Sequence, residues 1–289
     1  MAYNLARPPA GRRQRGASHD EQFSDSRARA RAAPHAVMRG RPALRIAAAS
    51  ACLAALLAIA AQTPRTAVAP ALAALPATML WAWERPEDLR WLPRTTGVAY
   101  VATTLELAAA TVRQRPRAYP LLVRADTVVV PVVHVDAAAD APPVLDARQR
   151  EAIVGAVLAA AAGSAAHVVQ LDFEVRRSQR VFLSGVVGDI RRRLPAGVAL
   201  SVTALASWCA GDYWIGALAA DEIVPMAFRM ARDGERIRAL LAERGGFVRP
   251  RCQGALGMAT DEPPLHTAAA RRYFFSPRAW DQAAWRRIE

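Results

Sequence analysis

Polar residues gather near the end of one short apolar segment, residues 167–175, which reads HVVQLDFEV. A β-strand has a side-chain period of two, so Gln170, Asp172 and Glu174 would share one face, with the two acids about 6–7 Å apart along the strand. Two acids on the inward face of a buried strand are costly unless they are solvated or used. Their proximity would raise one pKa, which keeps a carboxyl protonated near neutral pH. The pattern predicts a general acid, and the alternative is a structural ion pair with an arginine.

Other acids and aromatic residues follow other apolar segments. His134 and Asp136 share a face at the end of one of them, Glu84 follows Trp83, and Glu262 comes after a late segment. Sugar rings stack on aromatic faces while carboxylates bond their hydroxyls, so this mixture is typical of a saccharide site. A glycosidase needs a nucleophile or base besides its acid. Asp136, Glu84 and Glu262 are the candidates for this role, and the sequence does not choose between them.

Several kinds of catalysis lack the residues that they require. All 38 basic residues are Arg, so Schiff-base chemistry and Walker-type phosphate binding have no lysine. No G-x-G-x-x-G follows the first apolar segment, and no G-x-S-x-G is present. His134 and Asp136 supply two potential metal ligands without H-x-x-x-H spacing, which is a weak signal. We therefore expect neither a metal nor a cofactor.

The elements that must position these residues alternate between short apolar runs and helical patterns. Runs rich in β-branched residues indicate parallel strands that are buried on both faces. Eight such runs favour a closed (β/α)8 barrel over an open Rossmann sheet, and the active site of such a barrel lies at the carboxyl ends of its strands. The predicted strands are 77–83, 96–102, 127–136, 167–175, 197–205, 221–228, 253–259 and 271–276, and the predicted helices are 146–162, 180–194 and 232–244.

The stretch from Gln170 to Glu174 resembles the fourth-strand D-x-D-x-E motif of family 18 glycoside hydrolases, with Gln170 in place of the first Asp. The resemblance implies that Glu174 protonates the glycosidic oxygen and that Asp172 orients the substrate. The sequence Met226-Ala-Phe228 is similar to the sixth-strand Met-x-Tyr of that family, with Phe in place of Tyr. This similarity implies that Met226 and Phe228 line the substrate site.

The chain resembles more closely domain of unknown function 3142, a family of exported bacterial proteins, over nearly all of residues 78–280. Four motifs carry this resemblance: WAWERP from Trp81, the LDFE strand, LSVTALASW from Leu200 and PMAFRM from Pro225. It implies a glycosidase-like barrel without an established activity. Thr203 and Trp208 lie in the third motif, and we count both as candidates for substrate binding.

The net charge of +13 invites a nucleic-acid interpretation, but its distribution argues against one. Residues 1–45 carry ten Arg and three acids, a local charge of +7, which leaves +6 for the other 244 residues. No basic run there is longer than the three residues that begin at Arg191. We expect no nucleic-acid partner.

The N-terminal part has the features of a targeting segment. Residues 46–61 are uncharged and apolar, follow three Arg residues, and precede small residues that suit a cleavage site. We therefore expect a disordered basic tail or a misassigned start over 1–37, a signal peptide or signal anchor over 38–62, a linker over 63–76 and the barrel over 77–289. The expected location is periplasmic or secreted, with any membrane contact confined to this segment; the alternative is a buried Ala/Leu helix.

The late cysteines, Cys209 and Cys252, form an even pair that could make one disulfide in an oxidising compartment. Two unpaired thiols are the alternative, because spacing along the chain does not give the distance between them.

Together these features predict a glycoside-hydrolase-like barrel that acts on an extracytoplasmic carbohydrate by carboxylate general acid/base catalysis. The alternative is a catalytically inactive barrel that binds carbohydrate or serves as a structural part of the envelope. The predicted catalytic residues are Glu174 and Asp172, and the predicted substrate-binding residues are Trp83, Glu84, His134, Asp136, Gln170, Thr203, Trp208, Met226, Phe228 and Glu262.

Overall fold

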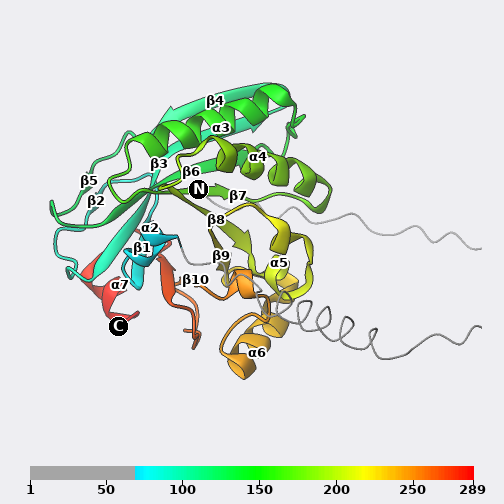
Figure 1. The fold of residues 1–289 in the computed structure, drawn as a ribbon. Helices are drawn as coiled ribbons and strands as arrows, with labels where there is room; N and C mark the ends of the chain where they lie inside the picture. Colours follow the sequence, from blue (N-terminus) through cyan, green and yellow to red (C-terminus); the bar gives the residue numbers. More distant parts are fainter. Residues whose placement is uncertain (1–68) are drawn as a thin grey trace, which may run out of the picture. The chain divides into compact units, whose positions relative to one another are not determined.

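The computed structural model describes residues 69–289, so the expectations for 1–37 and 38–62 lie outside the described residues. Eight parallel strands close into a barrel in the order β1-β3-β6-β7-β8-β9-β10-β11, because β11 pairs back onto β1 (Figure 1). The eight strands coincide with the eight predicted apolar runs. The (β/α)8 fold class predicted from the sequence is therefore confirmed.

The barrel strands have these bounds: β1 Thr78–Ala82, β3 Thr96–Ala108, β6 Val129–Ala137, β7 Val168–Phe173, β8 Ala199–Leu205, β9 Glu222–Met226, β10 Ala255–Ala259 and β11 Arg271–Phe275. The helices are α2 Pro70–Ala73, α3 Ala147–Ala162, α4 Arg180–Arg193, α5 Ala206–Gly211, α6 Gly234–Arg244 and α7 Gln282–Arg286. Short 3₁₀ turns are η1 Arg177–Gln179, η2 Trp214–Ala217, η3 Ala231–Asp233 and η4 Pro250–Cys252.

The two faces of each strand build two separate apolar layers, as the side-chain period of two requires. The inward face fills the barrel with residues such as Trp81, Val132 and Phe275. The outward face packs against the helices, and one apolar cluster contains both Leu171 of β7 and Ile153 of α3. Since both faces are buried, each strand appears in the sequence as a nearly continuous apolar run.

Helices α3 and α4 are the longest, and they lie side by side on the outside of the barrel (Figure 1). Helix α3 begins after Asp146, whose carboxylate accepts a hydrogen bond from the backbone N–H of Gln149 at 2.8 Å. This contact satisfies one of the free N–H groups at the helix start. Helix α6 ends at Gly245, which has a φ of 68° and can adopt this left-handed conformation without a Cβ clash.

Three short strands stand where an ideal barrel would have helices. β4 (Thr111–Pro116) pairs antiparallel with the far half of β3, and β2 (Glu87–Asp88) pairs with β5 (Leu121–Leu122). Strand β3 is 13 residues long and carries β4 along its second half. The chain therefore forms a β-hairpin from the second half of β3 and β4, where an ideal barrel would have a helix.

The segment expected as a linker contributes to the folded domain in its described part. Helix α2 lies within it, and both Leu72 and Leu75 are buried against the barrel interior. The carbonyl of Leu72 also accepts a hydrogen bond from Arg271 of β11. The domain thus begins several residues before 77, because apolar side chains of this segment close one end of the barrel. Within residues 69–289, no helix has the length and apolar character needed to cross a bilayer.

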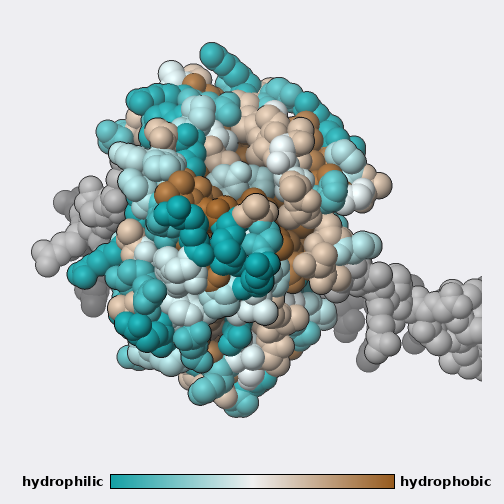
Figure 2. All heavy atoms as spheres, turned by 90° about the vertical axis from the view of Figure 1, so that its left-hand side faces the viewer, coloured by the Kyte–Doolittle hydropathy of each residue, from teal (hydrophilic) through white to brown (hydrophobic). Residues whose placement is uncertain are grey.

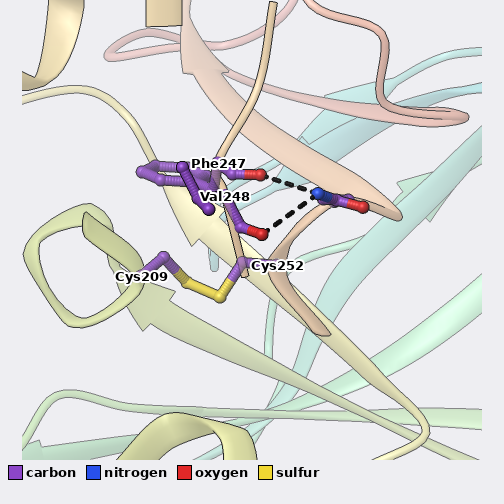
Figure 3. The surroundings of a disulfide bond; sticks show 5 residues. Cys209, Phe247, Val248 and Cys252 are labelled. Atoms are coloured by element: carbon purple, nitrogen blue, oxygen red, sulfur yellow. Dashed lines mark hydrogen bonds between the residues drawn. A yellow bond between two sulfur atoms is a disulfide. The ribbon is translucent and has the colours of Figure 1, made fainter. Parts of the chain in front are cut away.

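Cys209 and Cys252 form a disulfide with a Cα–Cα distance of 5.9 Å, so the first of the two alternatives is confirmed (Figure 3). The bond joins α5, which follows β8, to η4, which precedes β10. Next to it, the side-chain amide of Gln253 donates hydrogen bonds to the carbonyls of Phe247 and Val248. The crosslink therefore ties together two outer segments that lie on either side of β9 and α6 in the sequence.

Candidate active site

The carboxyl end of the barrel brings together a histidine, an aspartate and a threonine from three neighbouring strands. Strand register places His134 of β6 opposite Asp172 of β7. The Nδ1 atom of His134 lies 2.7 Å from one carboxylate oxygen of Asp172, and the hydroxyl of Thr203 on β8 donates to the other oxygen at 2.6 Å. Asp172 is buried, and both of its oxygens are engaged, so its position is fixed from two sides.

Glu174 directly follows β7, close enough to Asp172 and His134 for their charges to act on it. The residue is exposed, and its carboxyl forms no hydrogen bond or ion pair with another residue of the 69–289 domain. The surrounding protein atoms withdraw its carboxyl from bulk water, and the charge of Asp172 adds to this effect. Together they raise the pKa of Glu174 to about 7, although His134 acts in the opposite direction.

The pKa of His134 is raised from its ordinary value. Burial favours the neutral imidazole, but the hydrogen bond and the charge of Asp172, followed by the charges of Asp136 and Glu174, outweigh that effect. The imidazole therefore keeps its second proton to a higher pH than an unperturbed histidine would. The cluster thus places a carboxyl and an imidazole, both with raised pKa values, next to each other, an arrangement that acid and base catalysis can use.

Aromatic side chains continue the cluster across the barrel end. The Trp83 ring meets the imidazole of His134 edge-on, with 5.6 Å between centroids, and it also contacts Trp81. Trp81 stacks on Phe275, which in turn contacts Phe228, and both of these centroid distances are 4.6 Å. Trp83 and Phe228 are only partly buried. They therefore offer apolar ring surface beside the acids.

One face of the domain is mixed in character. The β2–β5 ribbon and α7 lie on the left-hand side of Figure 1. Figure 2 views the domain from that side and shows apolar surface near the centre of the face, bordered by hydrophilic groups. Apolar and polar surface therefore alternate over a short distance on this side of the domain.

The structure brings part of the predicted site together. His134, Asp172, Thr203 and Trp83 are in direct contact, and Glu174 is coupled to Asp172 and His134 by charge. Met226 is buried in the barrel interior, in the same apolar cluster that Phe228 contacts. Asp136 lies two residues beyond His134, is exposed, and forms no ion pair with any residue of the described domain.

Other predicted residues have different surroundings. Gln170 is fully buried inside the barrel, where its amide donates to Ser201 at 2.8 Å, so it does not face solvent at the strand ends. Trp208 is buried in the outer layer on α5, where it packs against Trp214. A fully packed position explains this Trp better than a substrate contact does.

Two of the predicted acids are held by arginines. Glu84 lies 3.6 Å from Arg115 of β4. Glu262 forms ion pairs with Arg229 and Arg238 and accepts a hydrogen bond from the backbone N–H of Arg229. A carboxylate whose oxygens are engaged in this way is poorly available as a nucleophile or base. Asp136 is the member of the group that has no such partner among the described residues.

A polar network deeper in the barrel was not predicted from the sequence. Glu222 of β9 pairs with Arg271 of β11, and it accepts hydrogen bonds from the hydroxyls of Tyr273 and Ser201. Through Ser201 the network reaches Gln170. Burial, followed by the charge of Glu222, raises the pKa of Tyr273 well above its ordinary value. The alternation of Arg271, Tyr273 and Phe275 on one face was the signal that could have revealed it.

Two surface hollows lie away from the cluster at the strand ends. One of about 420 Å³ is bounded by the end of α6, by Phe247 and by residues 267–269, and a smaller one lies beside it near Cys209. Neither brings an acid together with a histidine. Among residues 69–289, no group of three or more potential metal ligands is found. We therefore place the candidate site at the strand ends, where coupled titratable groups meet.

Comparison with known proteins adds little to this geometry. No protein-family model matches the chain, and no curated protein matches its sequence. Among solved structures, the chain is similar to the spore cortex-lytic enzyme SleL of Bacillus cereus, with a TM-score of 0.42 and 15% sequence identity. The match covers 66% of this chain and 55% of that chain, so it spans about half of SleL. The resemblance to domain of unknown function 3142 stays a prediction from the sequence.

Proposed function

We propose that the domain is a glycoside hydrolase that acts on an extracytoplasmic carbohydrate, with Glu174 as its general acid. The feature that carries the proposal is a carboxyl at the carboxyl end of the barrel that has no partner within residues 69–289 and whose pKa is raised to about 7. A general acid works best when its pKa lies near the operating pH, because it then both holds and releases its proton. Active sites of such barrels lie at this end.

Asp172 supports this role in two ways. Its negative charge disfavours ionisation of Glu174, so the acid keeps its proton to a higher pH. Its contacts with His134 and Thr203 hold it in one orientation. Because both of its oxygens are engaged, we assign Asp172 to tuning the acid rather than to direct attack on the substrate.

A glycosidase needs a second carboxylate as nucleophile or base. Of the three acids that the sequence left open, Glu84 and Glu262 are paired with arginines, whereas Asp136 is exposed and unpaired within the described domain. Asp136 also lies on the strand next to the one that leads to Glu174. We therefore propose Asp136 for the second role.

The aromatic residues support a carbohydrate as the ligand. Trp83 and Phe228 are partly exposed on either side of the buried rings Trp81 and Phe275. Aromatic rings provide broad apolar area with few rotatable bonds, which suits the apolar faces of pyranose rings. The segment Met226-Ala-Phe228, which resembles a glycoside hydrolase motif, brings Phe228 against Phe275.

The test is hydrolysis of a panel of soluble and insoluble polysaccharides by the full chain and by Glu174→Gln. The variant is nearly isosteric, so it should fold like the wild type, yet it should lose about 10²–10⁴-fold in rate because it cannot give up a proton. Glu151→Gln, an exposed acid of α3 on the outside of the barrel, is the matched control and should keep full activity.

Two results would refute the proposal. Equal rates for the wild type and Glu174→Gln would exclude Glu174 as the acid. Binding of a polysaccharide without any cleavage by the wild type would favour the alternative, a carbohydrate-binding or envelope-structural barrel.

A further inference from the structure

His134 is held in a defined position at the edge of the candidate site. The register of β6 and β7 sets it directly opposite Asp172, and their side chains meet at 2.7 Å through Nδ1. On another side the ring contacts Trp83 edge-on, with an interplanar angle of 89°. Two contacts of different kinds thus fix both the place and the plane of the imidazole.

The contact with Asp172 also fixes the proton on the imidazole. An ionised carboxylate accepts hydrogen bonds only, so Nδ1 must carry the proton that is shared with Asp172. The other nitrogen, Nε2, has no hydrogen-bond partner within residues 69–289, and the side chain is 23% exposed. The ring can therefore gain or lose its second proton without breaking the bond to Asp172.

Charges around His134 come from each neighbouring element. Asp136 lies on its own strand, Asp172 lies on the adjacent strand β7, and Glu174 directly follows that strand. Glu106 of β3 pairs with Arg115 at 2.7 Å, and Arg115 also lies near Glu84 after β1, so these two acids are largely compensated. Thr203 of β8 is neutral. Asp136, Asp172 and Glu174 therefore favour a positive charge on His134, and none of the three has an arginine partner in the described domain.

We propose that His134 is a positioning residue for the candidate acid: it holds Asp172 through Nδ1, and its positive charge limits how strongly Asp172 acts on Glu174. This inference rests on the proposed role of Glu174. His134 does not have to touch the substrate for this purpose, because its effect passes through Asp172. His134 and Glu174 then titrate as a coupled pair, in which protonation of one changes the pKa of the other.

The test measures the titration of Glu174 directly, without a substrate. The protein is labelled with glutamate carrying ¹³C at the side-chain carboxyl, and the Glu174 signal is assigned by its loss in Glu174→Gln. In His134→Asn the amide can still donate a hydrogen bond to Asp172, but the positive charge is gone. The midpoint of Glu174 should then rise by about one pH unit, because the charge of Asp172 is no longer compensated.

His167→Asn is the matched control. It makes the same substitution just before the amino end of β7, at an exposed position with a φ of 52° that Asn tolerates well. This variant should leave the midpoint of Glu174 unchanged. If His134 were only a structural hydrogen-bond donor, His134→Asn would replace it and the midpoint would also stay where it is, which would overturn the inference.

A reciprocal measurement keeps the inference testable if His134→Asn does not fold. In Glu174→Gln the imidazole of His134, followed by NMR, should titrate at a lower pH than in the wild type, because one of the acids that favour its charge has been neutralised. An unchanged His134 titration would overturn the coupling. If these shifts occur but no polysaccharide is cleaved, the proposed function fails while the coupling stands.

Discussion

At the scale of single residues, the candidate site depends on two acids, Asp172 and Glu174, that have different surroundings. Asp172 is buried and has two hydrogen-bond donors, whereas Glu174 has no partner within the described domain. A carboxyl that protein atoms withdraw from water and that lies beside another negative charge is favoured in its neutral form, as Glu174 is. Two residues of the same chemical kind, two positions apart, can thereby take different roles.

The raised pKa of Glu174 predicts a limit to activity on the alkaline side. A general acid must be protonated, and the protonated fraction of Glu174 falls as the pH rises through about 7. On a polysaccharide substrate, kcat/KM should therefore decline about tenfold per pH unit above that value. The measurement is a pH–rate profile from pH 5 to 9. A rate that stays level up to pH 9 would show that no group with this pKa acts as the acid.

At the scale of elements, the sequence predicted the strands well because each one is buried on both faces. Runs such as Thr127–Asp136 leave little ambiguity, since their β-branched residues suit a parallel strand and a helical layer follows. The sequence did not predict the β4 hairpin, because the exposed and charged residues 111–116 have no apolar period. Their pairing depends on the unusual length of β3, which only the folded barrel defines.

The candidate site was predictable in part for a related reason. Alternation along one strand placed Asp172 and Glu174 together, but the partners of Asp172 come from two other strands. Register between strands decides that His134 and Thr203 meet it, and no local pattern encodes that register. Trp208 was counted as a candidate because it lies in a motif of the resemblance to domain of unknown function 3142, and such a motif does not tell whether the ring faces a ligand or, as here, the outer layer.

The disulfide is the feature at this scale with a measurable effect on stability. It closes a segment of 43 residues, and in the chain-entropy model such a crosslink stabilises the fold by about 4 kcal/mol. Reduction should therefore lower the melting temperature by about 10 °C for a domain of this size. Differential scanning calorimetry with and without reductant measures this change.

The double variant Cys209→Ala/Cys252→Ala is the control for reduction. Both cysteines are buried, so the small side chains fit the same space. Its melting temperature should resemble that of the reduced wild type and should not respond to reductant. A wild type that melts at the same temperature in both conditions would contradict a stabilising role for the bond.

At the scale of the whole molecule, the disulfide and the N-terminal sequence favour the same compartment. Structural disulfides persist in oxidising environments, and residues 46–61 have the composition of a signal segment. We propose that the barrel works outside the cytoplasm. Alkaline phosphatase, which is active only when oxidised, should therefore be active when fused to the C-terminus of the full chain.

Deletion of residues 46–61 from the same fusion should abolish the phosphatase activity, because the chain would lose its targeting segment. Deletion of 16 residues within 1–37 is the matched control and should have a smaller effect. A fusion that is inactive with the complete N-terminal sequence, or one that stays active after removal of 46–61, would argue against export by this segment.

The central claim is that Glu174 donates a proton to the departing sugar oxygen, and the dependence on the leaving group tests it most directly. A good leaving group needs little protonation, so Glu174→Gln should cleave a 2,4-dinitrophenyl glycoside at a rate close to that of the wild type. The same variant should be slower by about 10²–10⁴-fold on the matching alkyl glycoside, where the proton is essential. If Glu174→Gln lowers both rates by the same factor, or lowers neither, the claim is contradicted.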